Sequence, residues 1–357
     1  MRILQVYSGP YQTNRGGGMS VYVRNISERL AKRHDVTVFG TAPPGFPRFE
    51  VVNGVKVERF KRVAPSGAYF FSMDMLLRLR KSDFDVVHGH GYQSLPLHLS
   101  TFAKKRKFIA STHYHGVGHS SFRSSLMKVL RRAGQRTLEK ADKVVAVSEY
   151  ERSLLRQQFK LDPYKMAVIP CGVDYNEFRG LVRHKHKEKS VLYVGRLESY
   201  KGAQYLIEVM PKLDDDWNLE IVGNGPMKPL LESRASELGI RKRVEFYQGL
   251  PRKELLQKFA DADVFVLLSR YEAYSMVIAE ALVAGTPCIV AKGSALTEWV
   301  DNENCFGIDY PLNIPRLAQL IEQVSEHRNE SGGEGLRKDK IKDWNHIVEE
   351  YEKIYSG

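Results

Sequence analysis

The stretch DVFVLLSRYEAYSMVIAEALVAGTPCIVAK (263–292) decides the fold class of this chain. Residues 263–269 and 287–292 are short, almost continuously apolar runs, which is typical of strands buried on both faces. Between them, residues 276–284 form an Ala-rich segment that predicts a short helix, ended by Gly285-Thr286-Pro287. Two buried strands joined through a helix pair in parallel, so this stretch indicates an α/β fold.

The same alternation fills the rest of the chain. Further strands are expected at 2–7, 35–40, 54–60, 85–90, 107–112, 143–148, 190–195, 218–223 and 243–249. Further helices are expected at 18–33, 70–81, 93–104, 121–140, 149–158, 202–212, 226–238, 251–260 and 313–327. Two such sets predict two Rossmann-like domains, each with a parallel sheet. Because ligands bind beyond the carboxyl ends of parallel strands, we expect the two sheets to face a central cleft.

The domain boundary is expected near VIPCGVDYNEF (168–178), because Pro170 and Gly172 are followed by a polar, basic stretch. We therefore predict one Rossmann-like domain over 1–170 and a second over 171–340. Residues 341–357 predict a C-terminal helix that closes back toward the first domain. Its expected apolar stripe consists of Trp344, Ile347, Tyr351 and Ile354.

Several classes of protein are disfavoured by composition. The first apolar run breaks at Ser8-Gly9-Pro10, so it resembles neither a signal peptide nor a membrane span, and no run of eighteen apolar residues follows. The cysteines, Cys171, Cys288 and Cys305, are odd in number and lack metal-ligand spacing. This favours a reducing, cytoplasmic location and disfavours a disulfide framework or a zinc site.

Charge is divided unevenly between the two halves. Residues 1–172 hold 29 Lys and Arg against 12 Asp and Glu, whereas residues 173–357 hold 25 against 30. The first half is therefore expected to face an anionic membrane surface, a phosphorylated substrate or nucleic acid. The alternative, a generally Lys-rich surface, would make both halves basic.

Three loops carry residues that suit a phosphorylated sugar. Three glycines at 16–18 precede a helix and allow an anion to approach its N-terminus, although a plain flexible loop would look similar. Arg196 and Lys201 follow a strand and suit a diphosphate, unless they form a surface ion pair. Glu272 and Glu280 lie in an apolar segment and can accept hydrogen bonds from sugar hydroxyls, with Ser275 expected to cap the helix between them.

These motifs together resemble the retaining family-4 glycosyltransferases (glycosyl transferases group 1) of GT-B fold. Glu272 and Glu280 have the Glu-x7-Glu spacing of that family. VIPCGVD resembles its hinge, VGRLESYKG (194–202) its G-R-L…K-G element, and IVGNGP (221–226) its V-G-D/N-G-P turn. The first half resembles the family more loosely, in GGGMSVYVRNIS, DVVHGHG and STHYHG. The resemblance covers essentially the whole chain, and it implies an acceptor-binding domain over 1–170 and a nucleotide-sugar-binding domain over 171–340.

The resemblance implies a retaining, metal-independent enzyme without a cofactor, which moves a hexose-type sugar from a UDP- or GDP-linked donor to a hydroxyl acceptor. Glu280 resembles the residue that binds the ribose, Glu272 the one that meets the donor sugar, and Arg196 and Lys201 the pair that holds the diphosphate. His113 matches a histidine near the sugar and acceptor, although a core or loop histidine is the alternative. The implied catalytic residues are His113, Glu272, Arg196 and Lys201, and the implied donor-binding residues are Gly17, Gly18, Arg196, Lys201, Glu272, Ser275, Met276 and Glu280.

The identity of the sugar is not implied, because Ala273-Tyr274-Ser275 stands where the family often has Gly-Phe-Gly. The usual hinge Asn is Cys171 here. Two alternatives remain open: a sugar-nucleotide epimerase of the same fold, and a catalytically silent protein that binds sugar nucleotides or nucleic acid. Nucleic acid has little support, because the basic half carries no RNA-binding motif.

The kind of acceptor is inferred from the pattern of basic and apolar residues in two segments. Segments 120–140 and 68–81 combine apolar residues with Lys and Arg, and both could lie on an anionic bilayer. We therefore expect a peripheral enzyme of glycan biosynthesis at the inner face of the cell membrane, acting on a lipid-linked or anionic glycan acceptor. Ordinary Rossmann helices with basic outer faces are the alternative.

Overall fold

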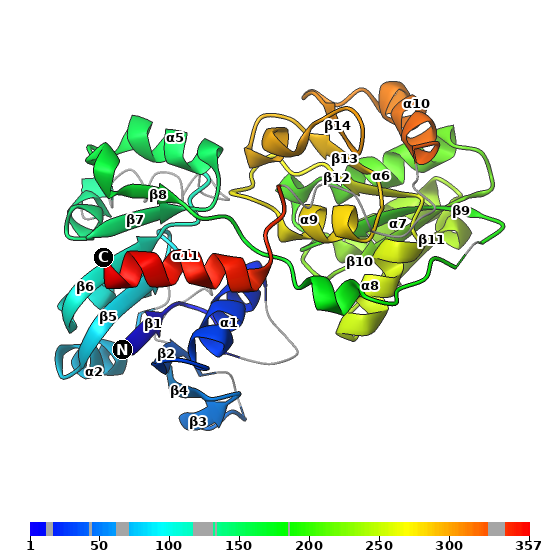
Figure 1. The fold of residues 1–357 in the computed structure, drawn as a ribbon. Coiled ribbons are helices and arrows are strands. Elements are labelled where there is room, and N and C mark those ends of the chain that lie inside the picture. Colours follow the sequence, from blue (N-terminus) through cyan, green and yellow to red (C-terminus); the bar gives the residue numbers. More distant parts are fainter. Residues whose placement is uncertain are drawn as a thin grey trace. The chain divides into compact units, whose positions relative to one another are not determined.

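The structure is a computed structural model that describes residues 1–11, 17–42, 45–61, 71–116, 131–132, 134–184, 186–327 and 340–357. The chain divides into two compact units. Unit 1 comprises Met1–Gly172 with Trp344–Gly357, and unit 2 comprises Val173–Asp343. Each unit is an α/β domain built around its own largely parallel sheet (Figure 1). The α/β fold class expected from the sequence is thereby confirmed.

The sheet of unit 1 has the strand order β3-β4-β2-β1-β5-β6-β7-β8. Neighbouring strands are parallel except β3 and β4. The order reverses at β1, where Ile3 pairs with Val36 on one side and Val86 on the other. The carboxyl ends of β1 and β5 therefore form a topological switch point. The strands are β1 (Arg2–Val6), β2 (Asp35–Thr41), β3 (Phe49–Val52), β4 (Val55–Phe60), β5 (Asp83–His90), β6 (Lys104–Ser111), β7 (Lys143–Ala146) and β8 (Met166–Val168).

The described helices of unit 1 include the last helix of the chain. They are α1 (Gly18–Leu30), α2 (Met73–Arg80), α3 (Leu95–Leu99), α5 (Glu149–Gln158) and α11 (Trp344–Ser356), with the 3₁₀ turns η1 (Ser100–Phe102) and η2 (Pro163–Lys165). Figure 1 shows α11 beside α1 within this unit. The expected stripe of α11 is corrected at its end, because Tyr355 is buried and Ile354 only half-buried. Of the helix expected at 121–140, residues 121–130 and 133 lie outside the described residues, and residues 134–139 are helical.

The sheet of unit 2 has the order β11-β10-β9-β12-β13-β14, and all its pairs are parallel. Its order reverses at β9, which lies between β10 and β12. The loops that follow β9 and β12 therefore flank the switch point. The strands are β9 (Lys189–Val194), β10 (Trp217–Val222), β11 (Val244–Tyr247), β12 (Val264–Leu267), β13 (Cys288–Ala291) and β14 (Cys305–Ile308).

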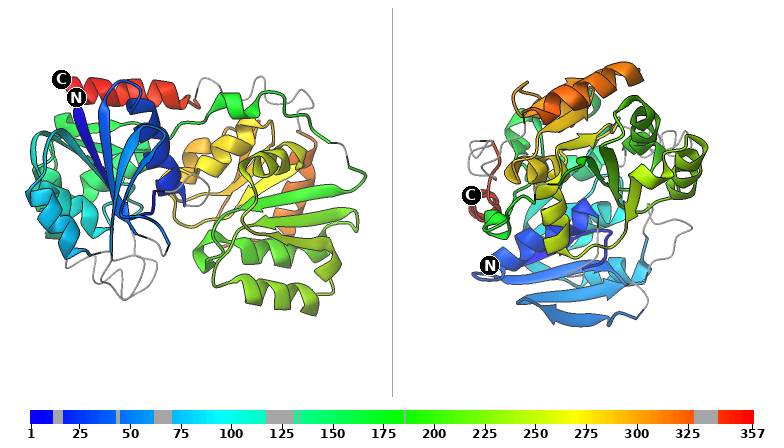
Figure 2. Two further views of the ribbon diagram at one scale, coloured as in Figure 1. Left: turned by 90° about the horizontal axis from the view of Figure 1, so that it is seen from below. Right: turned by 90° about the vertical axis from the view of Figure 1, so that its right-hand side faces the viewer.

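Helices cover both faces of the unit 2 sheet (Figure 2). The α-helices are α6 (Ala203–Val209), α7 (Lys228–Glu237), α8 (Arg252–Asp261), α9 (Met276–Val283) and α10 (Ile314–Ser325). The 3₁₀ turns are η3 (Tyr175–Phe178), η4 (Ser199–Lys201), η5 (Met210–Lys212), η6 (Arg241–Arg243) and η7 (Ala295–Trp299). α10 is amphipathic and is capped by Asn313, whose side chain accepts from Arg316 N. α9 is apolar on nearly all sides, which is the pattern of a helix buried in the core.

Some expected elements differ from those in the structure. The helix expected at 93–104 is instead α3 followed by η1, and β6 already begins at Lys104 because Lys104 pairs with Asp83 of β5. The strands β3, β8 and β14 are short and were not expected. The core strands β12 and β13 are fully buried and β9 is buried from Val191 onward, as their continuous apolar runs predict.

Candidate functional site

In unit 2, Lys201 and Glu272 come from the loops that flank the switch point. Lys201 ends η4 after β9, and Glu272 follows β12. Gly202 has φ +84, and a side chain there would meet the carbonyl of Leu268, so glycine lets η4 approach the end of β12. As a result, Lys201 Nζ lies 2.6 Å from Glu272 Oε1, and the two side chains are only 18% and 13% exposed.

The ion pair keeps Lys201 charged despite its burial. Burial disfavours the ammonium, but the carboxylate of Glu272 and its hydrogen bond outweigh this effect and raise the pKa of Lys201 above its ordinary value. Arg196 behaves differently, because its side chain is 68% exposed and its Nη2 lies 2.7 Å from Glu198 Oε1. The structure therefore brings Lys201 and Glu272 together, while Arg196 pairs at the surface.

Ser275 precedes α9 at the N-cap position, but its side chain does not cap the helix. Its φ of +90 is in the left-handed half of backbone space, and its side chain makes no capping hydrogen bond. Within the described part of the chain, no group hydrogen-bonds the buried Ser275 Oγ. The expected capping role is therefore wrong, and the first N–H groups of α9, including that of Met276, have no side-chain cap from Ser275.

Glu280, in the body of α9, is paired with Arg252, a residue that the sequence did not single out. Arg252 Nη2 lies 2.8 Å from Glu280 Oε1 and 2.7 Å from Glu177 Oε2. Burial raises the pKa of Glu280, and the guanidinium of Arg252 acts in the opposite direction. The one sequence signal for Arg252 is its position directly after Pro251, at the start of a predicted helix.

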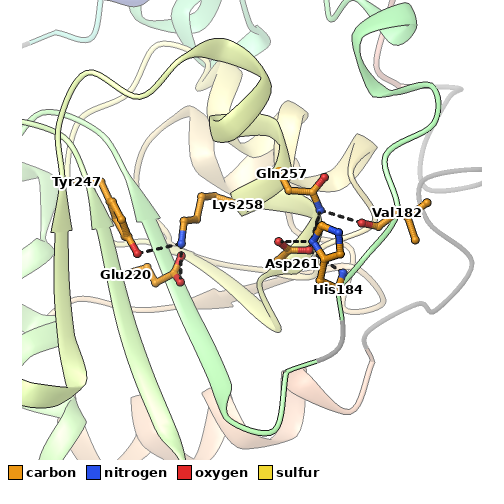
Figure 3. A network of polar contacts seen from close by, with 7 residues as sticks. All are labelled: Val182, His184, Glu220, Tyr247, Gln257, Lys258 and Asp261. Carbon is orange, nitrogen blue, oxygen red and sulfur yellow. Dashed lines mark hydrogen bonds and ion pairs between the residues drawn. The ribbon is translucent and has the colours of Figure 1, made fainter.

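The helix α8 that carries Arg252 is held from two sides (Figure 3). On one side, Lys258 Nζ lies 2.9 Å from Glu220 of β10 and 3.0 Å from the hydroxyl of Tyr247 of β11. On the other side, Gln257 Nε2 donates to Val182 O at 2.8 Å, and Asp261 accepts from His184 N at 2.8 Å. These contacts fix α8 to the sheet and to the chain segment before β9, and so fix the base of the Arg252 side chain.

In unit 1, Gly17 and Gly18 lie at the start of α1. Gly17 is the N-cap residue and its carbonyl accepts from Ser20 N at 2.9 Å, and both glycines are exposed. A side chain at Gly17 would meet no atom within 4 Å. Gly16 lies outside the described residues. The start of α1 therefore presents open backbone at the switch point of unit 1.

A buried polar network lies at the carboxyl ends of β1, β5 and β6 in the unit 1 sheet. His88 Nδ1 lies 2.7 Å from the Tyr355 hydroxyl, and His88 Nε2 lies 2.7 Å from Ser111 Oγ. His90 Nε2 lies 2.6 Å from Gln5 Oε1. Burial lowers the pKa values of His88 and His90 well below the ordinary range, so both are neutral at pH 7. Two tyrosines of α11 complete the network, because Tyr351 contacts Ser111 and Tyr22.

His113 follows β6 and has an unusual backbone, with φ +46. Its ring packs edge-on against Tyr22 of α1, with 4.7 Å between ring centroids. Burial lowers the pKa of His113 to about 4, so its imidazole is neutral at pH 7. No residue among those described hydrogen-bonds the buried Nε2 atom. His113 therefore combines a fixed ring with a nitrogen that a ligand hydroxyl could use.

Two negative findings concern only the described residues. No group of three or more His, Cys, Asp or Glu side chains is arranged to hold a metal ion there. None of the helices in that part of the chain is both long enough and apolar enough to cross a bilayer.

Two family models together match most of the chain. The model described as Glycosyltransferase Family 4 matches residues 16–177, and the model described as Glycosyl transferases group 1 matches residues 174–338. An uncharacterised glycosyltransferase of Methanocaldococcus jannaschii is 27% identical over 333 residues, which cover 86% of this chain and 85% of that protein. The GDP-mannose-dependent alpha-(1-6)-phosphatidylinositol monomannoside mannosyltransferase of Mycolicibacterium smegmatis is 29% identical over 310 residues, 80% of each chain.

Solved structures share the fold of the whole chain. Sucrose-phosphate synthase from Thermosynechococcus elongatus superposes with a TM-score of 0.83 at 21% identity, covering 99% of this chain and 98% of that one. Anabaena HepE, solved in complex with UDP and glucose, has a TM-score of 0.78 at 18% identity and covers 100% and 99%. At these identities the likeness concerns the fold, which is GT-B.

Proposed function

We propose that this protein moves a hexose-type sugar from a UDP- or GDP-linked donor to a hydroxyl acceptor with retention of configuration. The premise is that the chain belongs to glycosyltransferase family 4 (glycosyl transferases group 1). The observation that carries the proposal is the buried pair of Lys201 and Glu272 at the switch point of unit 2. A cation and a carboxylate at that point suit a phosphate and a sugar hydroxyl, respectively. Relatives named for GDP-mannose and a fold neighbour solved with UDP support a nucleotide-linked donor.

In the proposed donor site, each group meets one part of the ligand. The carboxylate of Glu280 accepts hydrogen bonds from the ribose hydroxyls, and Glu272 accepts from hydroxyls of the sugar. Lys201 meets the diphosphate, which also lies at the N-terminus of α9, at the N–H groups of Ser275 and Met276. Arg196 joins it by leaving Glu198, a step of low cost because that pair is exposed. In unit 1, Gly17 and Gly18 offer backbone N–H groups to an anion at the start of α1.

The proposed chemistry needs no protein nucleophile. The acceptor oxygen bonds to the anomeric carbon while the bond from that carbon to the phosphate oxygen breaks, and its electron pair stays on the diphosphate. The departing phosphate oxygen takes the acceptor proton, on the same face of the sugar. Lys201, Arg196 and the α9 N-terminus stabilise the growing phosphate charge, more strongly in the transition state than in the ground state. The Nε2 atom of neutral His113 hydrogen-bonds a hydroxyl of the sugar or acceptor.

The experiment is incubation with a panel of UDP- and GDP-hexoses, followed by separation of the products. Slow release of nucleoside diphosphate by hydrolysis, quickened by an acceptor, is the expected result. An isomeric sugar nucleotide without release would identify an epimerase instead. Binding without any turnover would identify a catalytically silent protein.

For the acceptor side, the proposal is an anionic membrane surface at the cytoplasmic face, bearing a lipid-linked or anionic glycan. Met73, Leu77 and Phe102 are about half exposed, although large and apolar. Arg80 stacks on Phe102 with 5.3 Å between its guanidinium carbon and the ring centroid. Apolar side chains among cations are typical of a surface that lies on anionic lipid. The test is sedimentation with anionic and with neutral vesicles, and equal binding to both would end this proposal.

A further inference from the structure

The start of α5 carries a capping box whose acidic member makes an unusual set of contacts. Ser148 is the N-cap, and its Oγ accepts from Glu151 N at 3.1 Å. In an ordinary capping box, the Glu side chain would reach back to the N–H of the N-cap residue. Here the carboxylate of Glu151 goes instead to Val147 N, at 2.7 Å, and to the loop that follows β6.

Two of the three hydrogen bonds described for the Glu151 carboxylate go to the residues on either side of His113. Glu151 Oε1 accepts from Tyr114 N at 2.5 Å and from the Thr112 hydroxyl. Thr112 and Tyr114 are the residues immediately before and after His113 in the chain. Glu151 itself has no exposed surface, so these bonds are shielded from water. One buried carboxylate therefore holds both neighbours of His113.

The backbone of His113 needs such support. Its φ of +46 is uncommon for a residue with a side chain, and such a conformation persists where the surroundings fix it. The ring also rests on Tyr22, so the position of the imidazole depends on the backbone beneath it and the ring beside it. Loss of the carboxylate would leave the N–H groups of Val147 and Tyr114 buried without acceptors.

We propose that Glu151 is a positioning residue for His113: it fixes the residues on both sides of His113 and thereby sets the orientation of the imidazole that takes part in sugar transfer. The link to sugar transfer rests on the function proposed above. The alternative is that Glu151 only stabilises the start of α5. Other groups near its carboxylate are Cys171 and the hydroxyl of Tyr351 of α11.

The test compares Glu151→Gln, His113→Ala and the double variant, with Glu149→Gln as the matched control. Glu149 lies on the same helix and pairs with Arg152 at the surface. Gln at 151 keeps one acceptor oxygen but turns an amide toward Val147 N–H, so it loosens the loop while preserving size. We expect kcat to fall about tenfold in Glu151→Gln, with a change in donor KM of less than about threefold, because Lys201 and Glu280, which are proposed to hold the nucleoside diphosphate, belong to unit 2. Glu149→Gln should match the wild type.

The double variant separates positioning from stability. If Glu151 acts through His113, the double variant should be no slower than His113→Ala alone. A loss equal to the product of the two single losses would overturn the proposal, as would wild-type kcat in Glu151→Gln.

A second readout does not need activity. NMR can follow the pKa of the His113 imidazole, with the signal assigned through His113→Asn. Because burial lowers this pKa to about 4, a loosened loop in Glu151→Gln should move it toward its ordinary value. An unchanged value would overturn the proposal. If the wild type transfers no sugar, the proposed function fails, and the NMR titration still decides whether Glu151 positions His113.

Discussion

Lys201 and Glu272 contact each other directly, with 2.6 Å between Nζ and Oε1, although each is proposed to meet a different part of one donor. A lysine ammonium has three N–H donors, so one can remain on Glu272 while the others reach phosphate oxygens. The pair thus holds both groups ready for the donor and compensates two largely buried charges.

Breaking this pair should destabilise unit 2. Lys201→Met leaves Glu272 without its cation, and Glu272→Gln leaves Lys201 without its carboxylate. We expect each to lower the free energy of unfolding by about 3 kcal/mol, and the double variant to lose clearly less than the sum. Urea titrations of the four proteins measure this. Additive losses would mean that the two side chains do not stabilise each other.

Arg252→Gln should weaken donor binding through Glu280. Without the guanidinium, no cation among the described residues offsets the effect of burial, so the pKa of Glu280 should rise further. The protonated acid is a poorer acceptor for ribose hydroxyls. Donor KM should therefore rise about tenfold at pH 7, and by more as the pH is lowered. Lys253→Gln, an equal charge change on the next and exposed residue, is the control, and the same KM in both variants would refute this role for Arg252.

Glu151 and His113 should act oppositely on stability as pH changes. The folded state raises the pKa of Glu151 to about 7, so between pH 4.5 and 7 it binds protons better than the unfolded state and this contribution falls as pH rises. The pKa of His113 is lowered to about 4, so its contribution rises with pH between 4 and 6.5. Glu151→Gln removes the first effect completely, whereas the expected rise in the pKa of His113 only weakens the second. Its Tm should therefore increase with pH more steeply than that of the wild type, whereas parallel Tm curves would contradict the shift.

Ser275→Gly should stabilise the protein by about 1 kcal/mol, because glycine adopts positive φ without steric cost. The glycine that the family often has at this position fits the same conformation. Ser294→Gly is the contrasting control, because Ser294 has φ −139 and its hydroxyl accepts from Leu296 N. That variant should lose stability, and chemical denaturation compares both. A loss in Ser275→Gly would show that Ser275 is not strained.

The sequence predicted most of the fold because the buried strands are continuous apolar runs and the helices have clear periodicity. β12, α9 and β13 lie where the stretch 263–292 places them. β3, β8 and β14 are only three or four residues long and partly exposed, so their patterns carry little signal. Tyr355 replaced Ile354 in the α11 stripe because its neighbours Gln5 and His88 belong to strands far away in sequence.

The sequence predicted those residues of the candidate site that directly follow strands. It did not predict residues whose role depends on contacts with other side chains. Glu272 and Lys201 could both be assigned to the donor site from the resemblance, and the structure brings them together because they follow the adjacent strands β12 and β9. Arg252 and Glu151 could not be identified, because their importance lies in contacts with Glu280 and with the loop around His113. The failure of Ser275 as a cap had no sequence signal except the departure from glycine.

The central claim is that unit 2 holds a nucleoside diphosphate through Lys201 and Glu280. The most direct measurement is titration calorimetry of UDP and GDP with the wild type, Lys201→Ala and Glu280→Ala. Lys253→Ala is the control, because Lys253 lies exposed on α8 and makes none of the contacts that hold this helix. One of the two nucleotides should bind the wild type and the control alike, and at least tenfold more weakly, roughly 1.4 kcal/mol, to each of the other variants. Wild-type affinity in both Lys201→Ala and Glu280→Ala would contradict the claim.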